Sequence, residues 1–291
     1  MKRKQDLQRI MIYMFAALLT LYIVLPLAWM LLSSVSNTKE LLRADGGFLP
    51  EHITLERYQA IFSNGAYMIN GVDMSETARV FQTSMKNSCI VAGTTTLVSL
   101  ILGGTAGYAF ARMKFRLRTP LFFLVLFLQM LPPIALILPY YVMIRRLEVM
   151  DKLGTLIVIY SAFVVSYAIW IFYGYFKNIP KEMVSAALID GCSHTTAFWK
   201  VVFPSALPGF VAVGALSFLL AWDEFMYALI FTNTDSAKTI PVAISEFGTR
   251  FGVDYGLMMT GGVLAALIPL LLAVVFQRYI VSGLTAGAVK E

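Results

Sequence analysis

The sequence is poor in charge. Only 14% of its 291 residues are charged, whereas 58% are hydrophobic. In a typical soluble domain about a quarter of the residues are charged, so the composition excludes an ordinary soluble protein. The apolar residues also come in long runs, which predicts an integral membrane protein of the all-α class.

Cysteine and histidine are equally scarce, with two of each, namely Cys89, Cys192, His52 and His194. The topology predicted below places the two cysteines in different compartments and the two histidines on opposite sides of the membrane. No disulfide framework and no Cys/His zinc spacing is therefore available, and we expect no metal site. An intramembrane enzyme would need a nucleophile–base pair or metal ligands inside the apolar runs, and no His or Cys pair is placed for one.

The sequence also lacks the P-loop pattern G-x-x-x-x-G-K-[ST]. Glycines in that pattern cradle nucleotide phosphates. A chain without it is not expected to be an ATPase, so any ATP-driven work needs a second polypeptide.

What the sequence has instead is apolar runs. A helix needs roughly 20 apolar residues to cross the hydrocarbon core, and six runs meet this length, at 10–32, 87–110, 120–144, 154–176, 208–231 and 258–280. Pro132, Pro133 and Pro139 are expected to kink the third. The first is too long for a signal-peptide core, so we expect an uncleaved anchor.

The basic residues predict the orientation, because Lys and Arg concentrate in cytoplasmic loops. They gather at the N-terminus and in the loop 112–118, which has no acid, whereas the segment 41–86 mixes acids with bases. Six spans then place both termini in the cytoplasm and the segment 33–86 outside. The net charge of +6 thus indicates membrane orientation and lipid contact, and no nucleic-acid partner is expected.

Two shorter patterns predict local structure. Gly103 and Gly107 form a small-xxx-small face, which brings helices close together. The stretch 53–64, ITLERYQAIFSN, is typical of a short helix on the membrane surface.

The segment 180–208 interrupts the apolar runs with an amphipathic stretch. Pro180 suits a helix start, and Gly191 suits the left-handed residue that ends a helix. Ser193 is placed to cap a second helix, which Pro204 and Pro208 are expected to end. This helix–turn–helix is either a connector that lies on the lipid headgroups or a docking element for a soluble partner.

This segment, PKEMVSAALIDGCSHTTAFWKVVFPSALP, resembles the EAA loop of ABC-importer permeases. The matching residues are Pro180, Glu182, Ala186, Ala187, Asp190, Gly191, Phe198, Pro204 and Pro208. Ser185 stands where the family usually has Glu, and Phe203 where it has Leu.

Three further stretches are similar to those of carbohydrate-uptake permeases: GYAFARMKF, AWDEFMYALIF and QRYIVSGLTAGAVK. In the second of these, Asp223 replaces the family's usual Asn. The stretches follow one another in the family's order.

The resemblance implies a type I ABC-importer transmembrane domain with six transmembrane helices. Residues 1–86 would form the anchor helix and a periplasmic segment, and residues 87–291 the permease core with its EAA loop at 180–208. The family places this loop on an ATPase subunit, which assigns docking roles to Glu182, Ser185, Ala186, Ala187, Asp190, Gly191 and Phe198.

The implied partners are a second homologous permease, two copies of the ATPase and a periplasmic or lipid-anchored solute-binding protein. No cofactor is expected in this chain, because ATP and Mg²⁺ would bind the ATPase. The implied location is the bacterial inner membrane.

Four residues are candidates for a translocation pathway: Trp222, Asp223, Glu224 and Gln129. A charge inside a span usually faces a cavity or a partner. Alternatively, Trp222 belongs to the aromatic belt at the outer interface, and Gln129 bonds between helices.

The expected function is the import of a sugar or sugar derivative by alternating access. A non-sugar solute, such as a polyamine or osmolyte, is the alternative, and an ATP-independent secondary transporter is a second.

Overall fold

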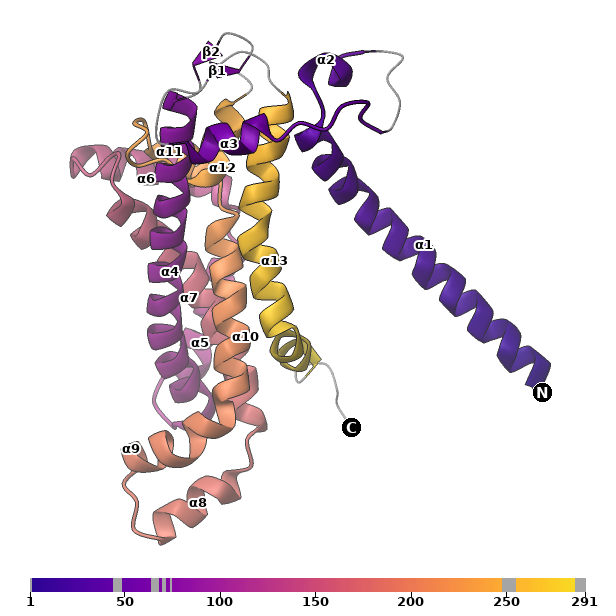
Figure 1. The fold of residues 1–291 in the computed structure, drawn as a ribbon. Coiled ribbons are helices and arrows are strands. Elements are labelled where there is room, and N and C mark those ends of the chain that lie inside the picture. Colours follow the sequence, from indigo (N-terminus) through magenta and orange to yellow (C-terminus); the bar gives the residue numbers. More distant parts are fainter. Residues whose placement is uncertain are drawn as a thin grey trace. The chain divides into compact units, whose positions relative to one another are not determined.

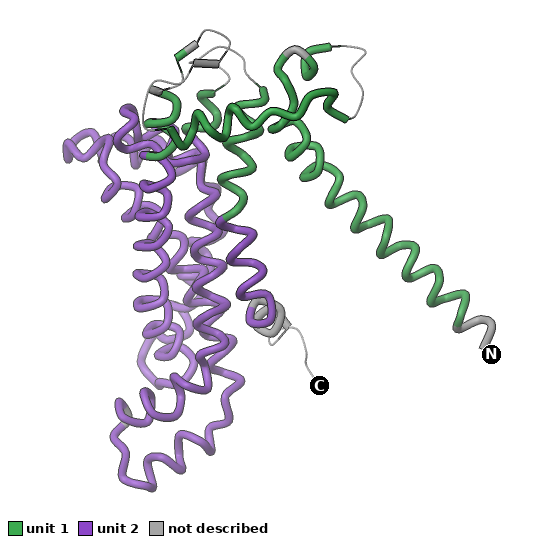
Figure 2. The backbone as a smooth tube through the Cα atoms, viewed as in Figure 1, with its two compact units in different colours: residues 1–82, 243–267 green, residues 83–242, 268–291 purple. Residues whose placement is uncertain are grey.

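The computed structural model describes residues 2–43, 49–63, 68–69, 72–73, 75–247 and 255–285. This part of the chain is almost entirely helical (Figure 1), as the all-α prediction requires. The chain forms two compact units (Figure 2). Unit 1 comprises Met1–Gln82 and Ala243–Leu267, and unit 2 comprises Thr83–Val242 and Ile268–Glu291.

Unit 1 contains the first apolar helix and the segment that follows it. Its elements are α1 (Lys2–Val35), α2 (Thr38–Leu41), α3 (Glu56–Phe62), the antiparallel pair β1 (Met68–Ile69) and β2 (Val72–Asp73), and parts of α4, α12 and α13. Arg57 is only 3% exposed. Its guanidinium donates to the Ser36 carbonyl at 2.7 Å and to Thr38 Oγ1 at 2.6 Å. These bonds fasten α3, the predicted surface helix, to the end of α1.

Unit 2 is a helical bundle. Its elements are most of α4 (Ser75–Arg112), α5 (Arg118–Gln129), α6 (Pro133–Arg146), α7 (Leu153–Asn178), α8 (Lys181–Ile189), α9 (His194–Ala197), a π-helical turn (Phe198–Val202), α10 (Phe203–Trp222), α11 (Met226–Phe231), and parts of α12 (Ile240–Glu246) and α13 (Tyr255–Thr285). Helix α7 packs against both α5 and α10. Its buried Ala168, Phe172 and Phe176 form a core with Val202 and Val213.

Glycine lets α4 approach α7 closely. A Cβ at Gly103 would lie 2.6 Å from Ala168 Cβ, and a Cβ at Gly107 would lie 2.6 Å from Phe172 Cβ. Real Cβ atoms do not come so near, so both positions require glycine. The predicted packing role of this glycine pair is confirmed.

Among the described residues, five helices are long and apolar enough to cross a membrane, and the pair α5–α6 passes the same test together. The runs predicted at 10–32, 87–110, 154–176 and 258–280 lie within α1, α4, α7 and α13. The run 120–144 is not one straight helix, because α5 and α6 meet at an angle of 93°. The break falls at Met130–Pro132, where Pro132 and Pro133 cannot donate the helical hydrogen bonds.

Two predicted boundaries are wrong. The run 208–231 is not one helix: α10 ends at Trp222, and α11 begins only at Met226. Pro204 and Pro208 do not end the second helix of the segment 180–208, since both lie within the first turns of α10. The π-helical turn before α10 explains this continuity, as described below.

Candidate functional site

We call the helix–turn–helix between α7 and α10 the elbow (residues 180–203). Its first helix begins and ends where the sequence predicts. Helix α8 begins directly after Pro180. Its end is a Schellman motif, in which the Gly191 N–H donates to the Leu188 carbonyl and the Cys192 N–H to the Ala187 carbonyl. Gly191 has φ +87°, which glycine adopts without strain. The prediction that Gly191 is the left-handed residue that ends this helix is therefore confirmed.

The second arm of the elbow runs into α10 without interruption. Ser193 Oγ accepts the Thr196 N–H at 3.2 Å, so the predicted cap is present. In the π-helical turn, the Phe203 N–H donates to the carbonyl of Phe198, five residues back. This wider turn leaves room before Pro204, which has no N–H to donate, so the prolines fit inside a continuous helix.

The inner side of the elbow packs against the bundle. Phe198 meets the rings of Tyr108 and Phe176 with centroid distances of 4.8 and 6.4 Å. The Arg112 guanidinium, at the end of α4, donates to the Ile179 carbonyl just before α8. Helices α4 and α7 thus both hold the elbow, and Phe198 belongs to its inner side.

The outer side of the elbow exposes apolar side chains. Ile189 is 86% exposed, Trp199 59% and Met183 41%. Glu182, Ser185, Ala186, Asp190 and Gly191 are exposed with them, whereas Ala187 is buried. Five of the seven residues expected to dock are therefore exposed, whereas Ala187 and Phe198 are not. The sequence analysis did not single out the exposed Met183, Ile189 and Trp199. The three-residue spacing of Met183, Ala186 and Ile189 is the signal that places them on one face.

Three of the four pathway candidates are consecutive residues that begin at the end of α10, and the fourth, Gln129, is the last residue of α5. Trp222 is buried at the end of α10, and Asp223 is exposed just after it. Glu224 caps α11, because its carboxylate accepts the N–H groups of Tyr227 at 2.8 Å and Ala228 at 3.2 Å. Gln129 Nε2 donates to the Ser166 carbonyl at 2.7 Å, which is a bond between α5 and α7.

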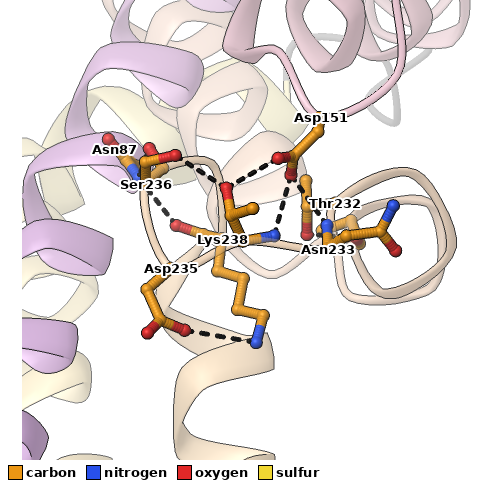
Figure 3. Close-up of polar contacts among 9 residues, drawn as sticks. Asn87, Asp151, Thr232, Asn233, Asp235, Ser236 and Lys238 are labelled. Atoms are coloured by element: carbon orange, nitrogen blue, oxygen red, sulfur yellow. Dashed lines mark hydrogen bonds and ion pairs between the residues drawn. The ribbon is translucent and has the colours of Figure 1, made fainter.

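A polar clamp, which we define as Asp151 with Asn233 and Thr234, joins the turn before α7 to the loop after α11. Asp151 Oδ1 accepts the N–H groups of Asn233 at 2.7 Å and Thr234 at 3.0 Å, and its Oδ2 accepts the Thr234 hydroxyl at 2.6 Å (Figure 3). In return, the Asp151 N–H donates to the Phe231 carbonyl at 2.9 Å. Sequence reasoning missed this clamp, because Asn233 and Thr234 lie 82 and 83 residues from Asp151 in the sequence.

Neighbouring residues extend the clamp toward α4. Asn87 Nδ2 donates to the carbonyls of Ser236 and Lys238, both at 2.9 Å (Figure 3). Lys238 Nζ pairs with Asp235 Oδ1 at 3.4 Å. One loop thus contacts α4 at Asn87, the start of α7 and the end of α11.

The clamp predicts a stability defect. Partial burial disfavours the charged Asp151, but the hydrogen bonds from Thr234 and Asn233 and the nearby Lys238 charge outweigh it and lower the pKa of the carboxyl. Three hydrogen bonds to a charged acceptor are lost in Asp151→Ala. Because the site is largely solvated, we expect a loss of about 1–3 kcal/mol in unfolding free energy. Thermal melting in detergent checks this, with the exposed Glu148→Gln as the control.

The same clamp predicts a pH dependence. A lowered pKa in the folded state means that the stabilisation is fully present above the unfolded value of about 3.9 and is lost as the pH falls through the folded pKa. The difference in melting temperature between the parent chain and Asp151→Ala should therefore stay constant from pH 8 to about pH 5 and shrink below about pH 4. A difference that grows on acidification would contradict this assignment.

Comparison with known proteins identifies a matching protein family. Residues 76–286 match the family described as binding-protein-dependent transport system inner membrane component. The chain is 33% identical to the trehalose/maltose transport system permease protein MalG of Thermococcus litoralis, with 99% of each chain covered. It is 32% identical to the trehalose transport system permease protein SugB of Mycobacterium tuberculosis, covering 92% of this chain and 93% of that one.

A solved structure shares the fold. It is the crystal structure of a bacterial ABC transporter involved in the import of the acidic polysaccharide alginate, and the match covers 95% of this chain and 98% of that one. The TM-score is 0.74 at 18% sequence identity. At this identity the likeness concerns the fold alone.

Proposed function

Because this chain belongs to the family of binding-protein-dependent transport system inner membrane components, we propose that it is the permease subunit of an ATP-driven importer for a sugar or sugar derivative. The substrate class is taken from the relatives, two of which are named for trehalose or for trehalose and maltose. A solute-binding protein would deliver the sugar on the outer side, and both termini would lie in the cytoplasm.

The elbow carries this proposal. It is braced on its inner side and presents Met183, Ile189 and Trp199 on its outer side. We assign this outer face to an ATPase subunit, which would bind and hydrolyse ATP–Mg²⁺. Glu182, Ser185, Ala186, Asp190 and Gly191 would contact it, while Ala187 and Phe198 would support the face from behind.

A two-state lever would link the elbow to the pathway. Helix α10 leaves the elbow through the π-helical turn and ends at Trp222, and its 20 residues span about 30 Å. Movement of the elbow would therefore shift the polar break at Asp223 and Glu224. ATP binding shifts such an equilibrium only if the ATPase grips one state more tightly than the other.

Within the proposed pathway, Asp223 would face the solute. Its side chain is exposed, whereas Trp222 is buried. Glu224 caps α11, and Gln129 bonds α5 to α7. A second homologous permease would complete the cavity on the other side. This pairing is what the family resemblance implies.

The elbow assignment predicts a loss of binding. Ile189→Asp places a charge on a side chain that is 86% exposed, so the fold has no reason to fail, whereas an apolar docking face would be disrupted. We expect co-purification of a P-loop ATPase from gentle detergent to fall at least about tenfold, equivalent to ~1.4 kcal/mol.

Leu147→Asp is the matched control, since Leu147 is exposed in the turn after α6. It should leave the ATPase bound. Equal recovery of the ATPase with Ile189→Asp would instead indicate a connector that rests on lipid headgroups.

A further inference from the structure

Unit 1 brings three side chains with metal-binding atoms together. Glu40 lies in α2, and Glu51 and His52 lie beyond the segment that follows it. One carboxylate oxygen from each Glu and one imidazole nitrogen lie within 4.8 Å of one another. No sequence spacing of Cys and His predicts such a site, because carboxylates from two separate segments complete it.

The backbone holds these segments in place. Ser36 and Ile53 form an antiparallel bridge, and the Thr54 N–H donates to the Val35 carbonyl at 2.8 Å. The Glu51 N–H also donates to Glu40 Oε2 at 3.2 Å. The stretch that carries Glu51 and His52 is therefore fixed against the end of α1, beside α2.

A cavity of about 170 Å³ opens beside the two carboxylates. Glu40, Glu51, Arg43 and Trp29 are among the residues that line it. The cavity provides room for an ion with its remaining water ligands, and polar and apolar groups both border it.

The donor set selects the kind of ion. Ca²⁺ and Mg²⁺ prefer oxygen ligands alone, whereas imidazole nitrogen together with carboxylate oxygen suits Zn²⁺ and similar divalent transition metals. Around Zn²⁺, neighbouring ligand atoms lie about 3.3 Å apart, from bond lengths of about 2.0–2.1 Å in tetrahedral geometry. The side chains of Glu51 and His52 are exposed, so rotation about their own bonds closes the difference.

Arg43 is the competing cation. Its Nη1 lies 3.8 Å from Glu51 Oε2, and the two side chains are 58% and 70% exposed. An ion pair at such exposure contributes about 0–1 kcal/mol. A divalent ion would displace it readily.

We propose that Glu40, Glu51 and His52 form a Zn²⁺-type site on the segment after α1, with Arg43 as the group that the ion displaces. Two carboxylates and one imidazole supply three ligands, and water in the adjoining cavity supplies the fourth. The ion fastens α2 to the stretch 49–53. The site is independent of the transport proposal, since it depends only on residues of unit 1.

Calorimetric titration of the full chain with ZnCl₂ tests the site, in detergent, after removal of metal by chelator, and with an affinity tag that contains no histidine. We expect one equivalent of Zn²⁺ per chain and no displacement by excess Ca²⁺ or Mg²⁺. His52→Ala and Glu40→Gln should each weaken binding at least about tenfold. His194→Ala and Glu56→Gln are the matched controls for His52→Ala and Glu40→Gln, because each changes the same type of side chain outside the site. Both controls should bind Zn²⁺ as tightly as the parent chain.

Arg43→Ala provides a test that a folding defect cannot imitate. Removing the displaced cation should tighten Zn²⁺ binding severalfold, whereas misfolding only weakens it. The proposal is overturned if the parent chain takes up no Zn²⁺, if His52→Ala binds as tightly as the parent, or if Arg43→Ala fails to bind more tightly.

Discussion

Gly191→Val is expected to insert and accumulate normally but to lose most of its ATP-driven solute uptake. Gly191 has φ +87°, and a β-branched residue is strained in that region by about 1–2 kcal/mol or more. No atom lies within 4 Å of a Cβ built at this position, so the strain is in the backbone alone. The variant should relieve it by giving up the Schellman bonds at the end of α8.

The size of the effect follows from the strain. A penalty of 1–2 kcal/mol lowers the ratio of the native elbow to its altered form by about 5- to 30-fold, and uptake into membrane vesicles should fall as the altered form becomes populated. Gly191→Asn is the matched control, because Asn tolerates the left-handed region, and it should retain most of the activity. Normal uptake by the Val variant would count against any mechanical role of the elbow.

The sequence predicted the elements whose signals are local. The apolar runs mark α1, α4, α7 and α13 by length alone. Gly191 and Ser193 form hydrogen bonds with residues only three positions away. The sequence therefore predicted both the end of α8 and the cap before α9. The same holds for the break at Pro132 and Pro133, because proline removes a bond within its own turn.

Pro204 shows where local rules fail. The residue usually ends a helix, but here the N–H of Phe203 moves its bond by one residue to Phe198. Phe198, whose carbonyl accepts this bond, also packs on Tyr108 and Phe176, which are 90 and 22 positions away in the sequence. We infer that these tertiary contacts, which no local pattern reports, favour the π-helical turn and the continuous helix.

The site residues divide in the same manner. Hydrophobicity cannot separate the face of α7 that packs on α10 from the face that meets lipid, because both environments select apolar side chains. No sequence pattern singles out Asp151, and only the fold brings Thr234 to it. Glu224 looked like a charge inside a span, and only the end of α10 at Trp222 reveals it as a helix cap.

Gly107→Ala is expected to destabilise unit 2, although alanine is the better helix former. The new Cβ would lie 2.6 Å from Phe172 Cβ and 3.3 Å from the Ile169 carbonyl. Overpacking of this kind costs about 1–3 kcal/mol, and a Gly→Ala change returns at most about 1 kcal/mol in helix propensity. Larger side chains should be worse, and Gly107→Leu should prevent accumulation of folded protein.

Gly93→Ala is the control, since it lies in the same helix with no atom within 4 Å of its Cβ position. It should gain the helix propensity without the clash, so its melting temperature should equal or exceed that of the parent. Truncating the facing side chain distinguishes the cause. In Gly107→Ala with Phe172→Ala, the atom that clashes, Phe172 Cβ, is still present, so stability should not recover. Recovery in this double variant would show that the ring, and not the close approach of α4 and α7, sets the requirement for glycine.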